Sequence, residues 1–338
     1  MAKCLAIADL FIDQEMMENG LALLEEKGIT VEVKNWQHEN LEALQKDNIT
    51  LEKQGSEAVD LSEELLAGIE EYDYIITQFA PIGKKVIDRA KNLKFIGVLR
   101  AGIENVNRSY AEEKGITVFN TPGRSETSVS EYAVGLMLSE IRNIARADRK
   151  LRNGEWEKYY PNGVLAPELK ESVVGLVGYG AIGQKVANLV RPFGGKIIFF
   201  DDYFTGETPD TQVSLEELVR QADIISMHYR LTPENKNMLN KEHFKKMKSN
   251  AVVINSARSG LINEQDLIEA LQTKEITGAA VDVFEQEPLP ADHPYLTLEN
   301  VTITPHIAGS TIGNFANSPK ILAARMVNEY LPTSMTAN

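Results

Sequence analysis

The chain has 338 residues, of which 43% are hydrophobic and 25% are charged. This balance is typical of a folded globular protein and excludes a disordered chain, and the length suits two domains of ~100–200 residues each. The formal net charge of −14 disfavours nucleic acid and anionic membranes as partners, and no apolar run approaches the roughly 20 residues of a membrane-spanning helix.

The first apolar run, residues 4–8, is too short for a signal peptide and is predicted to be a strand. It contains the single cysteine of the chain, Cys4, which has no partner for an internal disulfide. We expect a buried, inert thiol and, by default, a cytoplasmic protein.

Two sets of short apolar runs alternate with helical patterns along the chain. The first set comprises residues 4–8, 29–33, 74–77, 95–99 and 116–119, and the second comprises residues 173–177, 196–200, 223–227, 251–254, 278–281 and 301–304. This alternation predicts an α/β protein with two doubly wound parallel sheets, each covered by helices on both faces.

A longer helical pattern follows each set. Residues 127–153 are predicted to form one buried helix that begins with a capping box of Ser128 and Glu131 and ends at Asn153-Gly154. Such a helix suits a domain core or an interface equally well. Residues 311–331 are predicted to form the last helix. If it packs on the first domain, the chain passes twice between the domains and a ligand-binding cleft lies between them.

The motif Gly178-Tyr179-Gly180-Ala181-Ile182-Gly183 follows the strand at 173–177 and opens a helical pattern. In a dinucleotide-binding loop, Gly178 permits the tight turn, Gly180 lets the backbone approach the pyrophosphate, and Gly183 allows the helix to pack closely. The pyrophosphate then lies at the helix N-terminus, where free N–H groups favour an anion. A tight turn without a ligand is the alternative interpretation.

Asp201 ends the next predicted strand, where an acidic side chain binds the ribose hydroxyls of a dinucleotide. Because its carboxylate would repel the 2′-phosphate of NADP, the expected cofactor is NAD. Asp202 is the neighbouring candidate, and two solvated acids are the alternative.

Three further residues follow successive strands of the second set, namely Arg258, Glu287 and His306. Oxidation of an alcohol by hydride loss needs a base for the hydroxyl proton, and a histidine oriented by a carboxylate supplies one. A guanidinium grips a carboxylate through two parallel hydrogen bonds. No metal-ligand spacing of His and Cys competes with this set. The residues alone leave other candidates open, namely Glu285, His228, His243 and His293.

Six stretches of the chain occur in the order known from one family. They are residues 97–106, 120–123, 178–183, 255–260, 282–288 and 305–309. Through them the chain resembles the D-isomer-specific 2-hydroxyacid dehydrogenases, in particular their phosphoglycerate dehydrogenase-like branch.

The resemblance implies a Rossmann NAD-binding domain, residues 121–305, inserted into a flavodoxin-like substrate-binding domain formed by residues 1–120 and 306–338. It implies that Arg258, Glu287 and His306 are the catalytic residues, which selects Glu287 over Glu285, and that a homodimer forms through the cofactor domain. The implied substrate-binding residues are Arg100, Ala101, Gly102 and Arg258. The implied cofactor-binding residues are Gly178, Gly180, Ala181, Ile182, Gly183, Asp201, Tyr229, Ala257, Asp282 and Gly309, with Asp282 on the nicotinamide carboxamide.

The chain departs from phosphoglycerate dehydrogenases where those enzymes carry an arginine for the substrate phosphate. Residues 75–81 contain no basic side chain, and Lys84 and Lys85 lie beyond them. We therefore expect an NAD-dependent dehydrogenase of a small 2-hydroxy acid, with D-3-phosphoglycerate as an alternative substrate. Arg230 stands where much of the family has proline, and we find no resemblance for residues 36–60.

Two other functions are weighed against this one. A formate dehydrogenase shares the architecture, but formate has no hydroxyl proton, so the Glu287 and His306 pair disfavours it. A non-enzymatic, NADH-sensing corepressor-like protein keeps much of the same residue set, and turnover of a 2-oxo acid would distinguish it.

Overall fold

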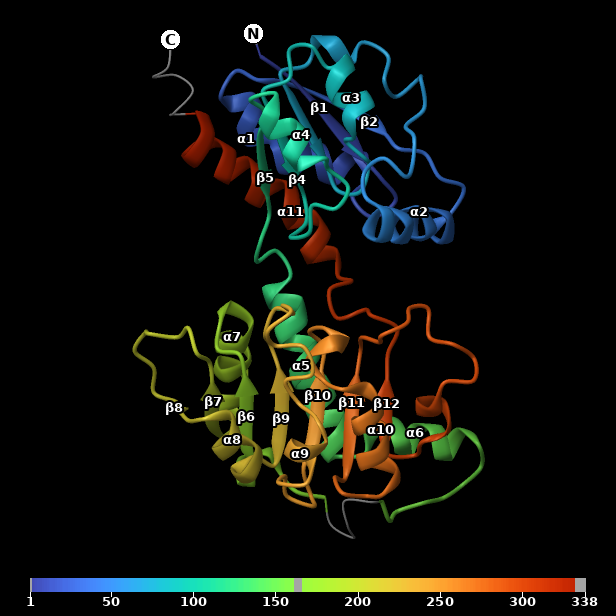
Figure 1. Cartoon of the computed structure of the whole chain (residues 1–338), viewed down its shortest axis with the longest axis vertical. Coiled ribbons are helices and arrows are strands. Elements are labelled where there is room, and N and C mark those ends of the chain that lie inside the picture. Colours follow the sequence, from blue (N-terminus) through green and yellow to red (C-terminus); the bar gives the residue numbers. More distant parts are fainter. Residues whose placement is uncertain (1, 161–165, 332–338) are drawn as a thin grey trace. The chain divides into compact units, whose positions relative to one another are not determined.

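The computed structural model describes residues 2–160 and 166–331. The chain folds as two compact units, which are described separately below. The first unit consists of Met1–Arg124 and Thr311–Asn338, and the second consists of Ser125–Ser310 (Figure 1). The boundaries lie a few residues beyond those expected from the sequence. Among the described residues, no helix is both long and apolar enough to cross a membrane.

The first unit contains a parallel sheet of five strands in the order β2-β1-β3-β4-β5, the flavodoxin-like order. The strands are β1 (Lys3–Ala8), β2 (Thr30–Asn35), β3 (Tyr74–Thr77), β4 (Phe95–Val98) and β5 (Thr117–Asn120). Every residue of β3 and β4 is buried, as expected for parallel strands with helices on both faces. The helices are α1 (Gln14–Glu26), α2 (Leu41–Gln54), α3 (Lys84–Arg89) and α4 (Arg108–Glu113), with a short 3-10 helix at Ile69–Glu71.

The last helix, α11 (Ile312–Arg325), belongs to the first unit and continues as a π-helical turn at Met326–Tyr330. It packs against α1 on one face of the sheet. The two helices come close to each other at Gly20 of α1, where an added Cβ would lie 2.5 Å from Cβ of Pro319 in α11. The last helix thus packs within the first unit, which is the case in which the chain passes twice between the units.

The second unit contains a parallel sheet of seven strands in the order β12-β11-β10-β9-β6-β7-β8. The strands are β6 (Val173–Val177), β7 (Lys196–Phe200), β8 (Thr211–Gln212), β9 (Ile224–Met227), β10 (Val252–Asn255), β11 (Gly278–Val281) and β12 (Val301–Ile303). β8 was not predicted because its two residues are exposed and polar. The order reverses direction at the neighbours β6 and β9, and ligands of such sheets bind beyond the strand ends at this point.

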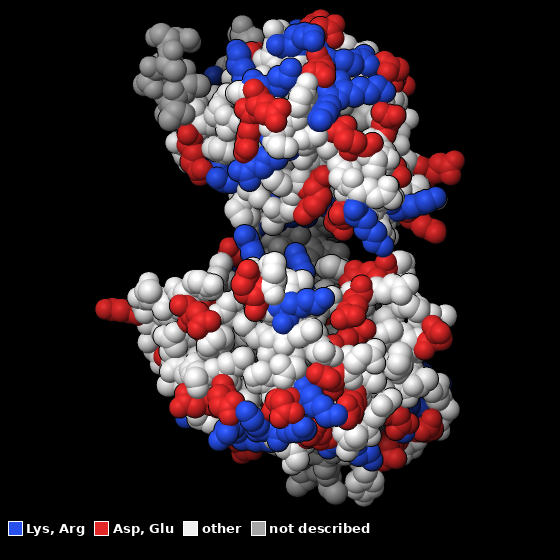
Figure 2. Space-filling view, viewed as in Figure 1, with Lys and Arg blue, Asp and Glu red and all other residues white. Residues whose placement is uncertain are grey.

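Helices cover both faces of the second sheet. They are α5 (Glu126–Ile141), α6 (Ile144–Arg152), α7 (Ala181–Val190), α8 (Leu215–Gln221), α9 (Lys241–Phe244) and α10 (Glu264–Gln272), with 3-10 turns at Leu169–Glu171, Arg191–Phe193, Ser259–Leu261 and Pro294–Thr297. Figure 2 shows acidic and basic side chains side by side over the visible face of each unit.

The prediction of a single helix over residues 127–153 is wrong. The chain forms α5 and α6, separated at Asn143, whose φ of 56° is left-handed. The predicted capping box is absent, because Ser128 lies inside α5 and its hydroxyl donates to the carbonyl of Ser125 at 3.1 Å. Only the end at Asn153, followed by Gly154 with a φ of 83°, is as expected.

A buried ion pair accounts for the break between α5 and α6. The turn at Asn143 brings the guanidinium of Arg146 back to the carboxylate of Glu140, and both side chains are almost fully buried. Arg146 also donates to the carbonyl of Glu299 at 3.1 Å, and Thr302 donates to Glu140. A continuous helix would carry Arg146 past this site and leave the Glu140 carboxylate buried without a cation, which is strongly unfavourable.

Candidate active site

The glycine motif forms a tight loop between β6 and α7 in the second unit. Gly178 has a φ of 100°, and a Cβ there would lie 2.9 Å from the backbone nitrogen of Tyr229. A Cβ at Gly183 would overlap the carbonyl oxygen of Gly178, whereas a Cβ at Gly180 would point into open space. Gly178 and Gly183 are thus required by the fold, and Gly180 is not.

The glycine loop has backbone N–H groups without a partner among the described residues, beside the open side of Gly180. The first hydrogen bond of α7 runs from the N–H of Gln184 to the carbonyl of Gly180 at 2.9 Å. The N–H groups of residues 180–183 donate to no other group in the part of the chain described, and Gly180 and Ala181 are exposed. Four free N–H groups at a helix N-terminus attract an anion. This open side of Gly180 and these donors fit the pyrophosphate of a dinucleotide.

Asp201 joins the end of β7 to the glycine loop. Its carboxylate accepts hydrogen bonds from the N–H groups of Tyr179 at 2.7 Å and Tyr203 at 2.8 Å. Each oxygen retains acceptor capacity for a ribose hydroxyl. Asp202 is exposed, and its N–H donates to the Tyr229 hydroxyl at 2.9 Å. The structure therefore places Asp201, and not Asp202, against the glycine loop.

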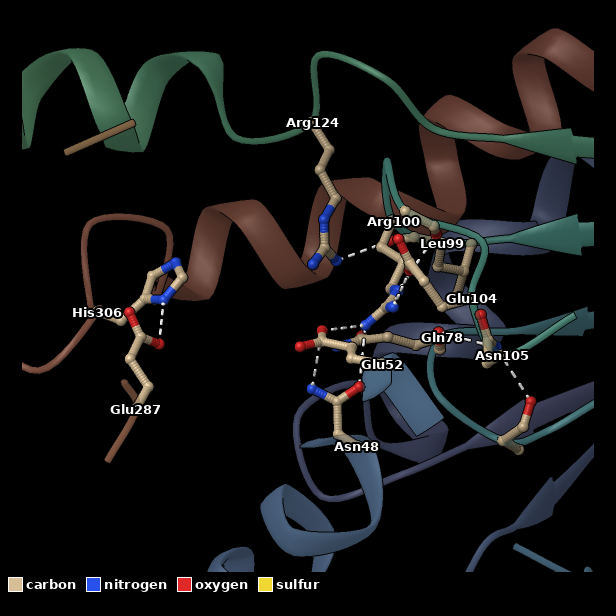
Figure 3. Close-up of polar contacts among 12 residues, drawn as sticks. Asn48, Glu52, Gln78, Leu99, Arg100, Glu104, Asn105, Arg124, Glu287 and His306 are labelled. Carbon is tan, nitrogen blue, oxygen red and sulfur yellow. Dashed lines mark hydrogen bonds and ion pairs between the residues drawn. The ribbon is translucent and has the colours of Figure 1, made fainter. Parts of the chain in front are cut away.

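His306 and Glu287 form a hydrogen-bonded pair in the second unit (Figure 3). Nδ1 of His306 lies 2.8 Å from Oε2 of Glu287, and Oε1 of Glu287 accepts from the N–H of Phe284 at 3.0 Å. The imidazole remains 49% exposed, so its other nitrogen is accessible. The sequence left Glu285 open, but the structure pairs Glu287 with the histidine.

The pair shifts the protonation of both members. The hydrogen bond that His306 donates to Glu287 raises the pKa of His306, against the opposing effect of burial. Burial acts to raise the pKa of Glu287, but the hydrogen bonds from His306 and from the N–H of Phe284 outweigh it and the pKa is lowered. The pair thus stabilises the imidazolium and the carboxylate together, so the pKa of His306 lies above and that of Glu287 below the usual value for its residue type.

Asp282 holds the loop that carries His306. Its side chain has no exposed surface. One carboxylate oxygen accepts from the Thr304 hydroxyl at 2.6 Å and from the N–H of Ile307 at 3.0 Å, and the other accepts from the N–H of Ala308 at 2.9 Å. These contacts give Asp282 a positioning role on His306 that the sequence did not indicate.

Arg258 lies after β10, is exposed, and donates to the carbonyl of Ala257 at 2.7 Å. Asn255 donates to the carbonyl of Arg258 at 2.9 Å and so fixes the loop. The charge of Arg258 opposes the protonation of His306 and lowers the pKa of Glu287. The three residues predicted from the sequence therefore gather at the carboxyl edge of one sheet.

The other histidines of the second unit have different surroundings. His293 lies 3.2 Å from Glu264, and His243 lies 3.1 Å from the side chain of Asn240. Burial lowers the pKa of His228 to about 4. His228 adjoins the glycine loop, and its neutral state avoids a buried charge.

The predicted substrate loop lies in the first unit, after β4. Its consecutive carbonyl groups are all hydrogen bonded: Leu99 to Arg124 at 2.7 Å, Arg100 to the N–H of Thr121 at 3.1 Å, Ala101 to the Asn120 amide at 2.6 Å, and Gly102 to Nε of Arg100 at 3.2 Å (Figure 3). Because a peptide N–H points opposite to its C=O, these bonds fix the directions of the Ala101 and Gly102 N–H groups. Neither donates to another described residue.

Sequence reasoning missed the residues that hold this loop. Asn120 ends β5, and Thr121 and Arg124 follow it. Because β5 pairs with β4, only the sheet brings these residues to the substrate loop after β4. The sequence placed Lys84 and Lys85 just beyond residues 75–81, which contain no basic side chain. The Lys84 amine lies over the Tyr110 ring, and the Lys85 amine is 3.2 Å from Asp60.

Arg100 is 6% exposed and already hydrogen bonded on several sides. This burial does not fit its predicted direct contact with substrate.

Comparison with known proteins places this geometry in a family. The family described as "D-isomer specific 2-hydroxyacid dehydrogenase, NAD binding domain" matches residues 134–308. The chain is 39% identical over 257 residues to the glyoxylate reductase of Thermofilum pendens, covering 74% of this chain and 76% of that protein. It is 40% identical over 254 residues to the hydroxypyruvate reductase of Thermotoga maritima, covering 74% and 82%.

This chain belongs to the D-isomer specific 2-hydroxyacid dehydrogenase family. It is also 40% identical over 255 residues to the D-3-phosphoglycerate dehydrogenase of Methanocaldococcus jannaschii, a match that covers 74% of this chain and 48% of that longer protein. The solved structure of D-2-hydroxyisocaproate dehydrogenase superimposes with a TM-score of 0.77, 25% identity and 97% of each chain covered. The predicted family, the NAD cofactor and the paired α/β fold are therefore confirmed.

The two glycines of the cofactor loop should respond differently to substitution. Gly180→Val fills open space, so we expect an unchanged unfolding temperature and NADH binding weakened by more than about tenfold, because the side chain displaces the pyrophosphate. Gly183→Ala forces a methyl group against the Gly178 carbonyl and should lower the unfolding temperature itself. Thermal unfolding and fluorescence titration with NADH measure both effects. Normal NADH affinity in Gly180→Val would contradict the assignment of this loop.

Proposed function

We propose that the protein interconverts a small 2-hydroxy acid and the corresponding 2-oxo acid, with His306 as the acid–base residue. The observation that carries this proposal is the 2.8 Å pair of His306 and Glu287, on the same sheet edge as the glycine loop. When bound, NAD(H) accepts or supplies the hydride. Its pyrophosphate would lie on the N–H groups of residues 180–183 and its ribose on Asp201, with Tyr229, Ala257 and Gly309 beside it at neighbouring strand ends.

Proton transfer, orientation of the imidazole and binding of the substrate carboxylate are assigned to different residues of the second unit. In the oxidative direction, the exposed Nε2 of His306 takes the hydroxyl proton of the substrate as the C2–H bond breaks. In the reductive direction, it returns a proton to the oxygen of the 2-oxo group. Glu287 holds the ring and stabilises the imidazolium. Arg258 binds the substrate carboxylate through its guanidinium.

The first unit is assigned to substrate binding. The fixed N–H groups of Ala101 and Gly102 are donors for an anionic group of the substrate, and backbone donors that are already oriented need no reorganisation on binding. Asp282, which the resemblance assigns to the nicotinamide carboxamide, is assigned here to holding the His306 loop, because its carboxylate has no exposed surface.

We further propose that the protein is a cytoplasmic homodimer. Four large apolar side chains are exposed along α6 and the segment after it: Ile144 (58%), Leu151 (57%), Trp156 (78%) and Tyr159 (68%). Large apolar side chains that are exposed to solvent favour burial against another protein. The single cysteine, Cys4, is buried in β1, which suits a reducing compartment.

The activity is tested by NADH oxidation with glyoxylate, pyruvate, hydroxypyruvate and larger 2-oxo acids. We expect turnover of at least one of them, and His306→Ala should lower kcat by about 10²–10⁴-fold because general acid catalysis is lost. NADH affinity should change little, since His306 does not touch the glycine loop. Tight NADH binding by the wild type without turnover on any 2-oxo acid would instead favour a sensing protein.

The pH profile of reduction should depend on Glu287. Reduction needs protonated His306, so its rate falls as the pH rises through the pKa of His306, which the hydrogen bond to Glu287 raises. In Glu287→Gln this limb should move to lower pH. The matched control is Glu285→Gln, two residues away, which should leave the profile unchanged. Equal profiles for wild type and Glu287→Gln would show that Glu287 does not set the protonation of His306.

The dimer surface is tested by Leu151→Asp with Trp156→Ser. We expect the mass in solution, measured by light scattering after gel filtration, to fall by about half, because charge is placed in an apolar contact. Leu296→Asp changes another exposed leucine of the same unit and should leave the mass unchanged. A wild type that is monomeric at micromolar concentration would remove this proposal.

A further inference from the structure

Arg100 is enclosed by its own unit. Its guanidinium donates to Asn48 at 2.9 Å, to Glu52 at 3.1 Å and to Glu104, while its Nε holds the carbonyl of Gly102. Phe79 lies under the guanidinium, with its ring centroid 5.3 Å away. Four of the five N–H donors of an arginine are thereby used. A phosphate could reach this group only by displacing both carboxylates.

Two of these partners come from α2, within the segment for which the sequence offers no resemblance. α2 begins at its N-cap Asn40 and is anchored on the core by Leu44 and Leu51, which are fully buried. Asn48 and Glu52 are four residues apart and therefore lie on the same helix face. This face is directed to Arg100, as Figure 3 shows. The helix thus delivers an acidic side chain to the substrate loop.

The charges that face solvent beside Arg100 are acidic. Glu52 and Glu104 both pair with the buried guanidinium of Arg100, and both carboxylates remain about half exposed. Glu104 lies directly against Gly102, where a built Cβ would be 2.9 Å from Oε1. The nearby Arg124 is turned toward the carbonyl of Leu99 and the hydroxyl of Ser318, at 2.7 and 3.3 Å. Lys84 and Lys85 point to Tyr110 and Asp60.

Aromatic side chains lie at the carboxyl edge of the same sheet in the first unit. Phe11 follows β1 and stacks on Phe315 of α11 with ring centroids 5.0 Å apart, and its edge meets Phe79 at 6.0 Å. Phe11 and Phe315 are only partly buried. Such rings favour contact with an uncharged group and offer a dianion no hydrogen bond.

We propose that Glu52 and Glu104 form an acidic clamp on Arg100 that sets the substrate class of this enzyme. The clamp makes Arg100 a positioning residue for the Gly102 carbonyl and repels a second negative charge on the substrate. The accepted substrates are 2-oxo acids whose only anionic group is the carboxylate, and phosphorylated 2-oxo acids are rejected. This inference rests on the proposed function and adds the specificity to it.

The test compares kcat/KM for hydroxypyruvate and 3-phosphohydroxypyruvate, which differ only by the phosphate. The wild type should prefer hydroxypyruvate by at least about tenfold, and Glu52→Gln with Glu104→Gln should reduce this preference about tenfold, through KM for the phosphorylated substrate. The control is Glu63→Gln with Glu112→Gln, which removes two carboxylates that pair with exposed arginines of the same unit. It should leave the preference unchanged.

A second measurement needs no variant. Salt screens repulsion between charges, so the preference of the wild type should shrink as the ionic strength rises from about 20 to 500 mM, and that of the clamp variant should change less. If the double variant does not fold, as judged by circular dichroism and thermal unfolding, the single substitutions and the salt series decide. A wild type that prefers the phosphorylated substrate, or a preference that neither salt nor the substitutions alter, overturns the clamp alone. Absence of turnover on every 2-oxo acid overturns the proposed function together with it.

Discussion

The geometry of the second unit depends on the buried carboxylate of Asp282. A carboxylate without solvent is stable only when its oxygens are hydrogen bonded, and the partners here lie on both sides of His306. His306 itself has a φ of 54°, a left-handed conformation that is unfavourable for a residue with a side chain. The hydrogen bonds to Asp282 compensate for this strain and present the imidazole to Glu287. The buried side chain of Asp282 thus fixes the loop on which His306 lies.

In the first unit, hydrogen bonds fix a loop as well, but there they occupy the carbonyl groups of the loop and leave N–H groups free within the described residues. Around residues 99–102, donors from Arg100, Asn120, Thr121 and Arg124 occupy the carbonyl groups and leave two N–H groups free. In the glycine loop of the second unit, the start of α7 leaves N–H groups free as well. Each loop therefore offers oriented donors to an anion, although the net charge of the chain is −14. Local backbone dipoles, and not the overall charge, make anion binding possible.

Two arginines show how position decides the role of a residue. Arg258 is exposed at the end of β10 and keeps most of its guanidinium for a ligand. Arg100 is buried between two carboxylates and supports its own loop. Arg258 was assigned to the substrate because an arginine after a strand suits an anionic ligand, and the family resemblance implied the same role for Arg100. Only the burial and the partners distinguish a ligand from a support.

The sequence by itself determined the two parallel sheets, nearly all of their strands and the glycine loop, because these depend on local periodicity and on single residues such as Gly178. It also indicated Arg258, Glu287 and His306, since parallel strands end at a common edge. The division of 127–153 into two helices, the turn of Asp282 toward its neighbours and the enclosure of Arg100 were decided only by the tertiary structure. Each depends on a charged side chain and a partner that is distant along the chain or reached only after the backbone turns. Local pattern carries no information about such pairs, because their energy arises only when folding removes the water around them.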